Sequence, residues 1–148
     1  MDALLRDLYG HQAWADAVHW RAIQAHEPAR EDSAIRNRLH HLHQVQRAFM
    51  WIVGDRATEF AFSKPEDFKT LGDLKLFARE SHAAMDRFWS SVTDARLVER
   101  VTIAWFKDPP LAITVGEALT QCAMHSQWHQ ARTRRGCASS APRRRRSI

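Results

Sequence analysis

Apolar residues recur at intervals of three and four along most of the chain, which is the spacing of one face of an α-helix. The pattern predicts four long helices, over about 2–26, 33–54, 70–92 and from about 114 onwards. The 148 residues include only five glycines and five prolines, and β-branched runs are few. The sequence therefore predicts an all-α fold.

Local signals mark where three of these helices begin. Ser33 is expected to cap the second helix. Thr70–Asp73 and Thr114–Glu117 each have the spacing of a capping box, in which a threonine and an acidic residue bond each other's backbone N–H groups. Between the helices lie two long connections, over 55–69 and 98–113, and these favour a four-helix bundle with long crossovers.

The second long connection contains the apolar stretch Val101–Phe106, which is expected to be a short extended piece. No apolar run approaches the roughly 18 residues of a membrane span. The N-terminus lacks the basic start and apolar stretch of a signal peptide, and the two cysteines, Cys122 and Cys137, form no disulfide framework. The expected location is the cytoplasm, without membrane attachment.

The charge of the chain is concentrated at one end. The net charge is +5, but residues 132–148 hold seven arginines and no acid, which leaves 15 basic and 17 acidic residues elsewhere. A nucleic-acid-binding fold normally carries its basic residues on the folded surface, so nucleic acid is not the expected partner. The sequence predicts one domain over 1–135 and a basic, low-complexity tail over 136–148 that is disordered.

Histidines interrupt the apolar face of the fourth predicted helix. His125 and His129 are four residues apart and project from one face, which they share with Ala118, Gln121 and Cys122. Burying unpaired imidazoles costs free energy, so they are expected to be hydrogen-bonded or metal-bound. A chance pairing among the nine histidines is the alternative that spacing alone leaves open.

A third histidine is expected from the cluster His40–His43 on the second helix. At 100° per residue, His43 lies at the edge of the apolar stripe, whereas His41 points towards solvent. His43 is therefore best placed to join His125 and His129. Three imidazoles would leave a coordination position open, as catalytic metal sites do.

Several motifs, taken in order, resemble the DinB-like superfamily of metal-binding four-helix bundles. The segment His11–Asp16 resembles the first helix of that family, and His43, eight residues before Trp51, resembles the second. Thr114–Glu117 leading into His125–His129 resembles the fourth. The match covers residues from about 4 to 131.

This resemblance implies an up-down-down-up bundle, often a homodimer. It assigns His43, His125 and His129 as ligands of one divalent metal, and Zn, Ni, Fe or Mn suit neutral imidazoles. It also implies a thiol-dependent S-transferase or isomerase that acts on a small molecule and uses a low-molecular-weight thiol such as bacillithiol or mycothiol. The chain departs from the family at Gln130–Arg132, where the family usually has Arg-Gly-Gln.

Two other functions stay open. One is a non-catalytic helical-bundle dimer with a structural or residual metal site, and the weaker one is nucleic-acid binding through the arginine-rich tail around Arg143–Arg146. A solvent-open metal with an adjoining pocket would favour the enzyme. A closed site would favour the non-catalytic bundle.

Neighbouring side chains are candidates for supporting roles. Gln46 and Gln121 lie where they could hydrogen-bond the ligand imidazoles. His11, on the expected inward face of the first helix, is predicted to be a core histidine rather than a proton carrier. Cys122 is expected to be a small buried filler rather than a fourth ligand. His82, at the edge of the third helix's apolar face, is expected to have no role.

Overall fold

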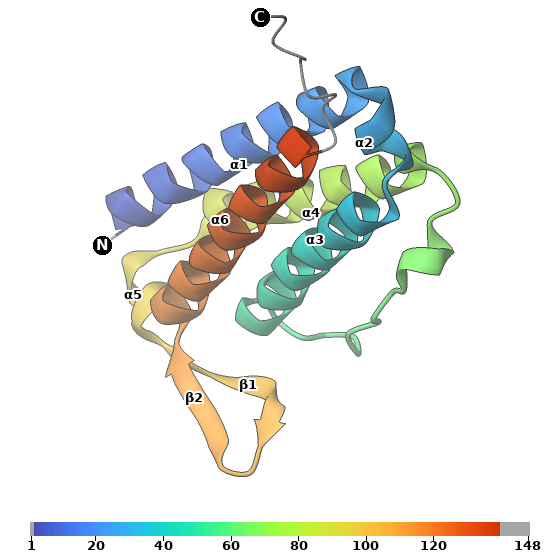
Figure 1. Ribbon diagram of the computed structural model, residues 1–148. Helices are drawn as coiled ribbons and strands as arrows, with labels where there is room; N and C mark the ends of the chain where they lie inside the picture. Colours follow the sequence, from blue (N-terminus) through green and yellow to red (C-terminus); the bar gives the residue numbers. More distant parts are fainter. Residues whose placement is uncertain (1, 140–148) are drawn as a thin grey trace, which may run out of the picture.

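The computed structural model describes residues 2–139 and the side chains of 3–134, and it is mostly helical (Figure 1). The prediction of an all-α fold is confirmed in part, because the fold is mostly helical but also contains a small two-stranded sheet. The four long helices are α1 (Asp2–Ala25), α3 (Ser33–Val53), α4 (Leu71–Ser91) and α6 (Val115–Ser139). Three short helices were not predicted, namely α2 (Glu27–Glu31), the 3-10 helix η1 (Pro65–Asp67) and α5 (Asp94–Val98).

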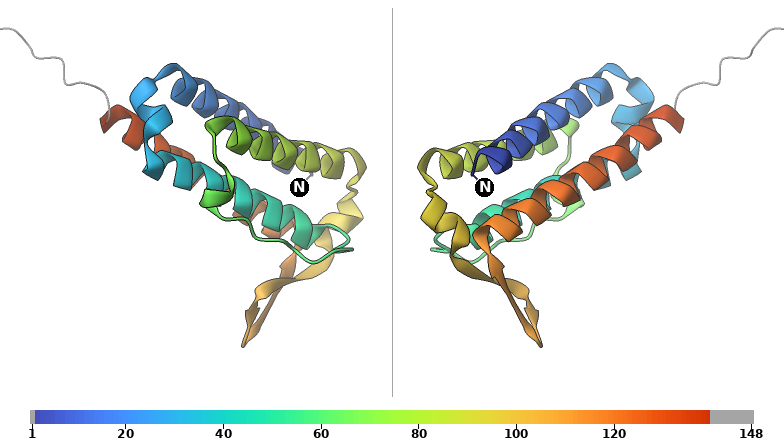
Figure 2. Two further views of the ribbon diagram at one scale, coloured as in Figure 1. Left: turned by 90° about the vertical axis from the view of Figure 1, so that its right-hand side faces the viewer. Right: turned by 90° about the vertical axis from the view of Figure 1, so that its left-hand side faces the viewer.

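Each long helix packs against two others. Helix α3 contacts both α6 and α4, and α1 also contacts both of them. Figure 1 shows α6 crossing in front of α4, and the two views in Figure 2 show α1 and α4 along one side of the molecule and α3 and α6 along the other. Helix α3 therefore has two covered faces, one towards α4 and one towards α6.

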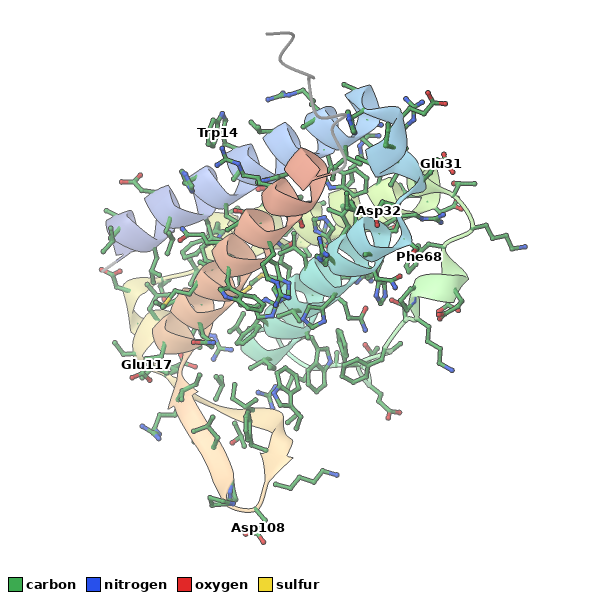
Figure 3. All side chains as sticks on the ribbon, viewed as in Figure 1. Trp14, Glu31, Asp32, Phe68, Asp108 and Glu117 are labelled. Atoms are coloured by element: carbon green, nitrogen blue, oxygen red, sulfur yellow. The ribbon has the colours of Figure 1, made fainter. Side chains whose placement is uncertain are left out.

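The start of α3 is set by Asp32, not by Ser33 as predicted. Asp32 Oδ1 accepts hydrogen bonds from the backbone N–H groups of Ala34 (2.8 Å) and Ile35 (3.1 Å), and Figure 3 shows Asp32 at the beginning of the helix. A carboxylate both accepts these bonds and interacts favourably with the positive end of the helix dipole. This explains why the neighbouring aspartate takes the position.

Both predicted capping boxes are present. Thr70 Oγ1 accepts from the N–H of Asp73 (3.1 Å), and Asp73 Oδ2 accepts from the N–H of Thr70 (2.8 Å). Thr114 and Glu117 make the same pair of bonds at 3.1 and 2.7 Å. In each case two backbone donors that the helix leaves unpaired are satisfied.

We expect Thr114→Ala to lower the free energy of unfolding by about 1 kcal/mol, because the N–H of Glu117 loses its acceptor. Thr120→Ala is the matched control on the same helix, since the Thr120 hydroxyl only bonds back to the carbonyl of Gly116. That bond does not favour a helix, so the control should stay within about 0.5 kcal/mol. Urea denaturation of both variants measures the difference. Equal losses would contradict the capping role.

A β-hairpin leads into α6. Strand β1 (Arg100–Lys107) pairs antiparallel with β2 (Pro110–Thr114), with Val101 opposite Ile113. The predicted extended piece is thus confirmed as part of a hairpin. The hairpin projects from the end of the helices (Figure 2). Figure 3 shows Asp108 at its tip and Glu117 near the junction with α6.

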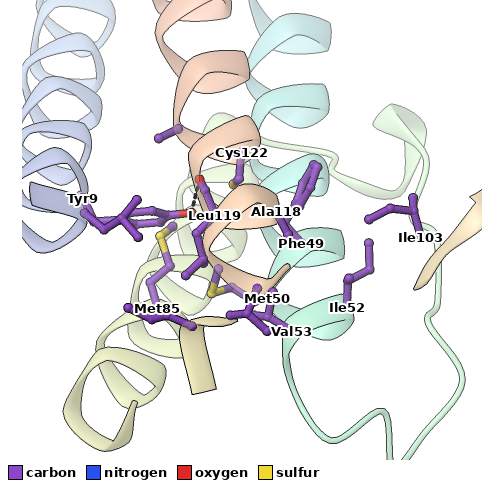
Figure 4. Packing of buried hydrophobic residues seen from close by; sticks show 14 residues of the cluster. Tyr9, Phe49, Met50, Ile52, Val53, Met85, Ile103, Ala118, Leu119 and Cys122 are labelled. Carbon is purple, nitrogen blue, oxygen red and sulfur yellow. Dashed lines mark hydrogen bonds between the residues drawn. The ribbon is translucent and has the colours of Figure 1, made fainter. Parts of the chain in front are cut away.

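The main apolar core joins the long helices to the base of the hairpin (Figure 4). Leu5 and Tyr9 of α1 belong to it, and the Tyr9 hydroxyl donates to the carbonyl of Leu119 (2.9 Å). His11, expected on the inward face of this helix, is exposed, and so is Leu4, at 75%. The inward face of α1 therefore differs from the predicted one, and the prediction of His11 as a core histidine is wrong.

Helix α6 continues to Ser139, beyond the predicted end of the domain at residue 135. The first residues of the predicted tail, 136–139, have helical backbone, whereas the run Arg143–Arg146 lies outside the described residues. Within the described range 2–139, no helix is long and apolar enough to cross a membrane.

Candidate metal centre

Helices α3 and α6 bring three imidazoles together. His125 and His129 lie one turn apart on α6, with ring centroids 4.4 Å apart. The ring of His41, from α3, lies 5.2 Å from that of His125 and 4.7 Å from that of His129. Each ring offers a nitrogen within 4.8 Å of the nitrogens offered by the other two.

One separation between ring nitrogens fits a shared cation. Two nitrogens bound to one zinc ion at about 2.0–2.1 Å and at a tetrahedral angle lie about 3.4 Å apart. The Nε2 atoms of His41 and His125 are 3.3 Å apart. A hydrogen bond between the two rings would also give this distance, so the distance alone does not distinguish the two arrangements.

Two further ring nitrogens of the α6 pair are unsatisfied in the part of the chain that the structure describes. The Nδ1 atoms of His125 and His129 are shielded from solvent and have no hydrogen-bond partner among the described residues. A polar atom that is buried without a partner costs free energy. For His125 the unpaired Nδ1 lies across the ring from Nε2, and one imidazole binds an ion through one nitrogen, so the support for a shared cation is the convergence of the three rings.

The three rings are in the protonation state that binds metal. Burial lowers the pKa of His41, and burial together with the ring of His41 lowers the pKa of His125. Burial and the neighbouring rings of His125 and His41 lower the pKa of His129 to about 4, with Arg132 and Arg38 acting in the same direction. All three imidazoles are neutral at pH 7, and neutral imidazole is the metal-binding form.

These pKa values predict acid-sensitive stability in the metal-free protein. Below about pH 6.5 the unfolded chain binds protons at these histidines while the folded protein does not. The free energy of unfolding should therefore fall as the pH drops from about 6.5 towards 4. Chemical denaturation at several pH values should show a shallower fall for the triple variant His41→Asn, His125→Asn, His129→Asn. An unchanged slope would show that the three rings do not titrate in this way.

The structure does not bring His43 to this site, although the sequence pointed to His43, His125 and His129 as the three ligands. The His43 ring is completely buried: its Nε2 accepts from Trp20 Nε1 (3.1 Å), and its Nδ1–H donates to Gln46 Oε1 (2.8 Å). Both nitrogens are therefore in use. Gln46 does orient an imidazole, as predicted, but that imidazole lies outside the cluster on α6.

His41 rather than His43 meets the histidines of α6 because α3 has two covered faces. A helical-wheel argument assumes one inward face, and it correctly places His43 inside and His41 on the more exposed side. His41 is nevertheless at the seam with α6, where it meets His125. A second apolar stripe, His41–Val45–Ala48–Ile52 at helical spacing, is the signal in the sequence that could have revealed this face.

A second polar cluster, separate from the three histidines, is centred on the buried carboxylate of Asp16. Asp16 is 1% exposed, and its oxygens accept from Gln130 Nε2 (2.7 Å), Gln46 Nε2 (3.0 Å) and His82 Nε2 (3.2 Å). These partners lie on α6, α3 and α4, so one carboxylate connects all four long helices. His82, expected to have no role, is one of them. Gln130 belongs to the segment that departs from the family motif.

This cluster is satisfied without a cation. Asp16, His43 and His82 are close enough to hold one, but the carboxylate oxygens and both nitrogens of His43 already have partners. Burial would raise the pKa of Asp16, but the hydrogen bonds and charges of His82, His43 and Gln46 outweigh it and hold that pKa below its usual value. Burial lowers the pKa of His43. We interpret the cluster as a structural network.

Cys122 lies in the apolar core between α6 and α1 (Figure 4) and is completely buried. Burial raises the pKa of its thiol to about 12. The group is therefore a neutral thiol at pH 7, which agrees with a buried filler and not with a thiolate ligand.

A cavity of about 770 Å³ adjoins the histidine cluster at His125. It lies between α3, the start of α6 and the hairpin, and His125 forms part of its wall. Most of the wall is apolar, and its aromatic members are Phe49, Phe62, Trp105 and Phe106. The polar members are Gln44, Glu117, Gln121 and His125. Pockets of this size and character typically bind small molecules.

Comparison with known proteins adds no identity. No protein family, curated protein or solved structure matches the chain.

Proposed function

We propose that this protein is a divalent-metal-dependent enzyme of the DinB-like type, with His41, His125 and His129 as the metal ligands. The observation that carries the proposal is the convergence of three neutral imidazoles, each of which offers a nitrogen within 4.8 Å of those offered by the other two. A DinB-like four-helix bundle, up-down-down-up, is part of the proposal. The mutual packing of the four long helices supports it. The ligand set differs from the one that the resemblance implies, because His41 replaces His43.

An open site favours an enzyme over a structural metal site. His41 is exposed and His125 is half-buried, and His125 also borders the cavity. Three protein ligands leave room for a further ligand. A bound divalent ion such as Zn, Ni, Fe or Mn would lower the pKa of a coordinated water or thiol and so supply a nucleophile at neutral pH.

Residues around His129 hold its ring in place. The Trp128 ring packs edge-on against it, with centroids 4.7 Å apart. The guanidinium of Arg132, four residues after Trp128 on α6, lies 4.5 Å from the centroid of the Trp128 ring. Packing of this kind restricts the rotamers of a ligand side chain and reduces the entropy that it loses on binding a metal.

A cobalt titration tests the proposal. Protein purified without a histidine tag and freed of metal is titrated with Co²⁺, and the visible spectrum reports coordination. We expect one equivalent to bind. Adding a low-molecular-weight thiol should then produce a sulfur-to-cobalt charge-transfer band, because the fourth position is open.

The triple variant His41→Asn, His125→Asn, His129→Asn is the control and should bind less than about a tenth of an equivalent. Equal binding by the variant and the wild type would overturn the metal site. Full metal binding with no spectral response to any thiol would overturn the thiol-dependent activity while leaving the metal site in place.

A further inference from the structure

A buried carboxamide in the wall of the cavity has an unused donor. Gln44, on α3, is 7% exposed and lines the cavity. Its Oε1 accepts from the hydroxyl of Ser63 (2.8 Å), while its Nε2 is buried and has no hydrogen-bond partner among the described residues. Leaving such a donor unpaired costs free energy, so its position beside a cavity points to a ligand.

The donor is held in a fixed direction. Ser63 Oγ, which bonds the carbonyl end of Gln44, is itself 2.9 Å from His40 Nε2. The ring of His40 is 7% exposed and packs against Phe68 and Phe77, with centroids 5.4 and 6.0 Å away. The chain His40–Ser63–Gln44 therefore fixes the amide with its carbonyl end towards Ser63.

The other polar residues of the cavity wall, Glu117, Gln121 and His125, all lie on α6. The carboxylate of Glu117 is engaged by the capping bonds to Thr114. Gln121 and His125 follow Glu117 at successive turns of α6, so they form a polar strip that leads to the metal site. The rest of the wall is apolar. The cavity thus combines an apolar surface, a polar strip that leads towards the metal site, and a wall residue, Gln44, whose amide donor is unpaired within residues 3–134.

We propose that this cavity binds a small molecule with an aromatic-sized apolar body and one hydrogen-bond acceptor, such as a carbonyl oxygen, that takes the free N–H of Gln44. If this small molecule is the substrate of the enzyme, it is an apolar carbonyl compound whose reactive end lies at His125. The assignment as substrate rests on the proposed function. The binding itself does not need the metal, so the two proposals can fail separately.

The test compares two probes of matched shape on metal-free protein. Calorimetry measures the binding of 2-acetylnaphthalene, which carries a carbonyl, and of 2-ethylnaphthalene, which does not. We expect the ketone to bind about threefold to tenfold more tightly, the range of one net hydrogen bond. In Gln44→Leu the two affinities should become equal. An unchanged ratio in that variant would overturn the role of Gln44.

A second variant keeps the proposal testable if Gln44→Leu does not fold. Gln121 is exposed on α6, so Gln121→Trp should fold and fill the cavity, with loss of binding of both probes. Gln127→Trp is the matched control, because Gln127 is also exposed on α6 but lies outside the cavity wall. It should bind both probes as the wild type does.

Three outcomes would overturn the proposal. Neither probe binds the wild type; Gln121→Trp binds both probes normally; or sedimentation shows a dimer that Gln121→Trp dissociates, which would make a second copy of the chain the occupant. Because metal is absent throughout, none of these results depends on the cobalt titration.

Discussion

His41→Gln should lower the affinity for Co²⁺ or Zn²⁺ at least about 100-fold, while His43→Gln should change it less than about threefold. Loss of a partner that only orients a ligand typically costs 10–100-fold, so loss of a ligand should reach at least the upper end. His41 Nε2 lies 3.3 Å from His125 Nε2, whereas both nitrogens of His43 are already bonded. Competition with a chromophoric chelator measures both affinities.

His40→Gln is the control within the same cluster. His40 bonds Ser63 and belongs to neither group of candidate ligands, so its affinity should match that of the wild type. In His43→Gln, the glutamine retains a donor and an acceptor, which limits the loss of the hydrogen bonds that His43 makes to Trp20 and Gln46. The reverse result, with His43 essential and His41 dispensable, would restore the ligand set that the family resemblance implies and would contradict the geometry described above.

Asp16→Ala should lower the free energy of unfolding by about 3–5 kcal/mol, because each buried donor left without its acceptor costs about 1–3 kcal/mol. The variant leaves the amide donors of Gln46 and Gln130 and the ring of His82 without their acceptor. These groups lie on three helices, so the substitution weakens the contacts of α1 with α3, α4 and α6. Denaturation by urea at pH 7 measures the change.

Asp7→Ala is the matched control, since Asp7 is exposed on the same helix, and it should change the free energy of unfolding by less than about 0.5 kcal/mol. The pH dependence gives a second check. The folded-state pKa of Asp16 is lowered, so its contribution is complete above about pH 4 and is lost as the pH falls through that lowered value. A loss below about 1 kcal/mol at pH 7 would show that the network contributes little.

The sequence was most informative where structure is decided locally. The capping boxes at Thr70 and Thr114 depend on residues three apart, and both are present. The error at Ser33 is one residue, because Asp32 competes for the same role. The extended piece at Val101–Phe106 was also predicted from its own composition, although its partner strand was not.

The sequence was less informative where a neighbouring helix decides. Gln12 and Asp16 are buried on α1 because other helices supply their partners, and a pattern based on hydrophobicity counts such residues as solvent-facing. The same limit hid His41, whose surroundings depend on the placement of α6. His125 and His129 were identified because their relation lies within one helix. Asp16 did stand in the first-helix motif, but its role could not be derived from the motif.

The direct junction between β2 and α6 separates the residues that shape the cavity from those that hold the histidines. The strand ends at Thr114 and the helix begins at Val115, with the N–H of Val115 bonded to the carbonyl of Glu99 (2.9 Å). Trp105, Phe106 and Leu111 of the hairpin form cavity wall, yet none of them belongs to the helices that hold the histidines. Changes of sequence over residues 104–111 would therefore reshape the cavity while the three imidazoles stay in place on α3 and α6. Ile103 is excluded from this range, because it is buried in the main core.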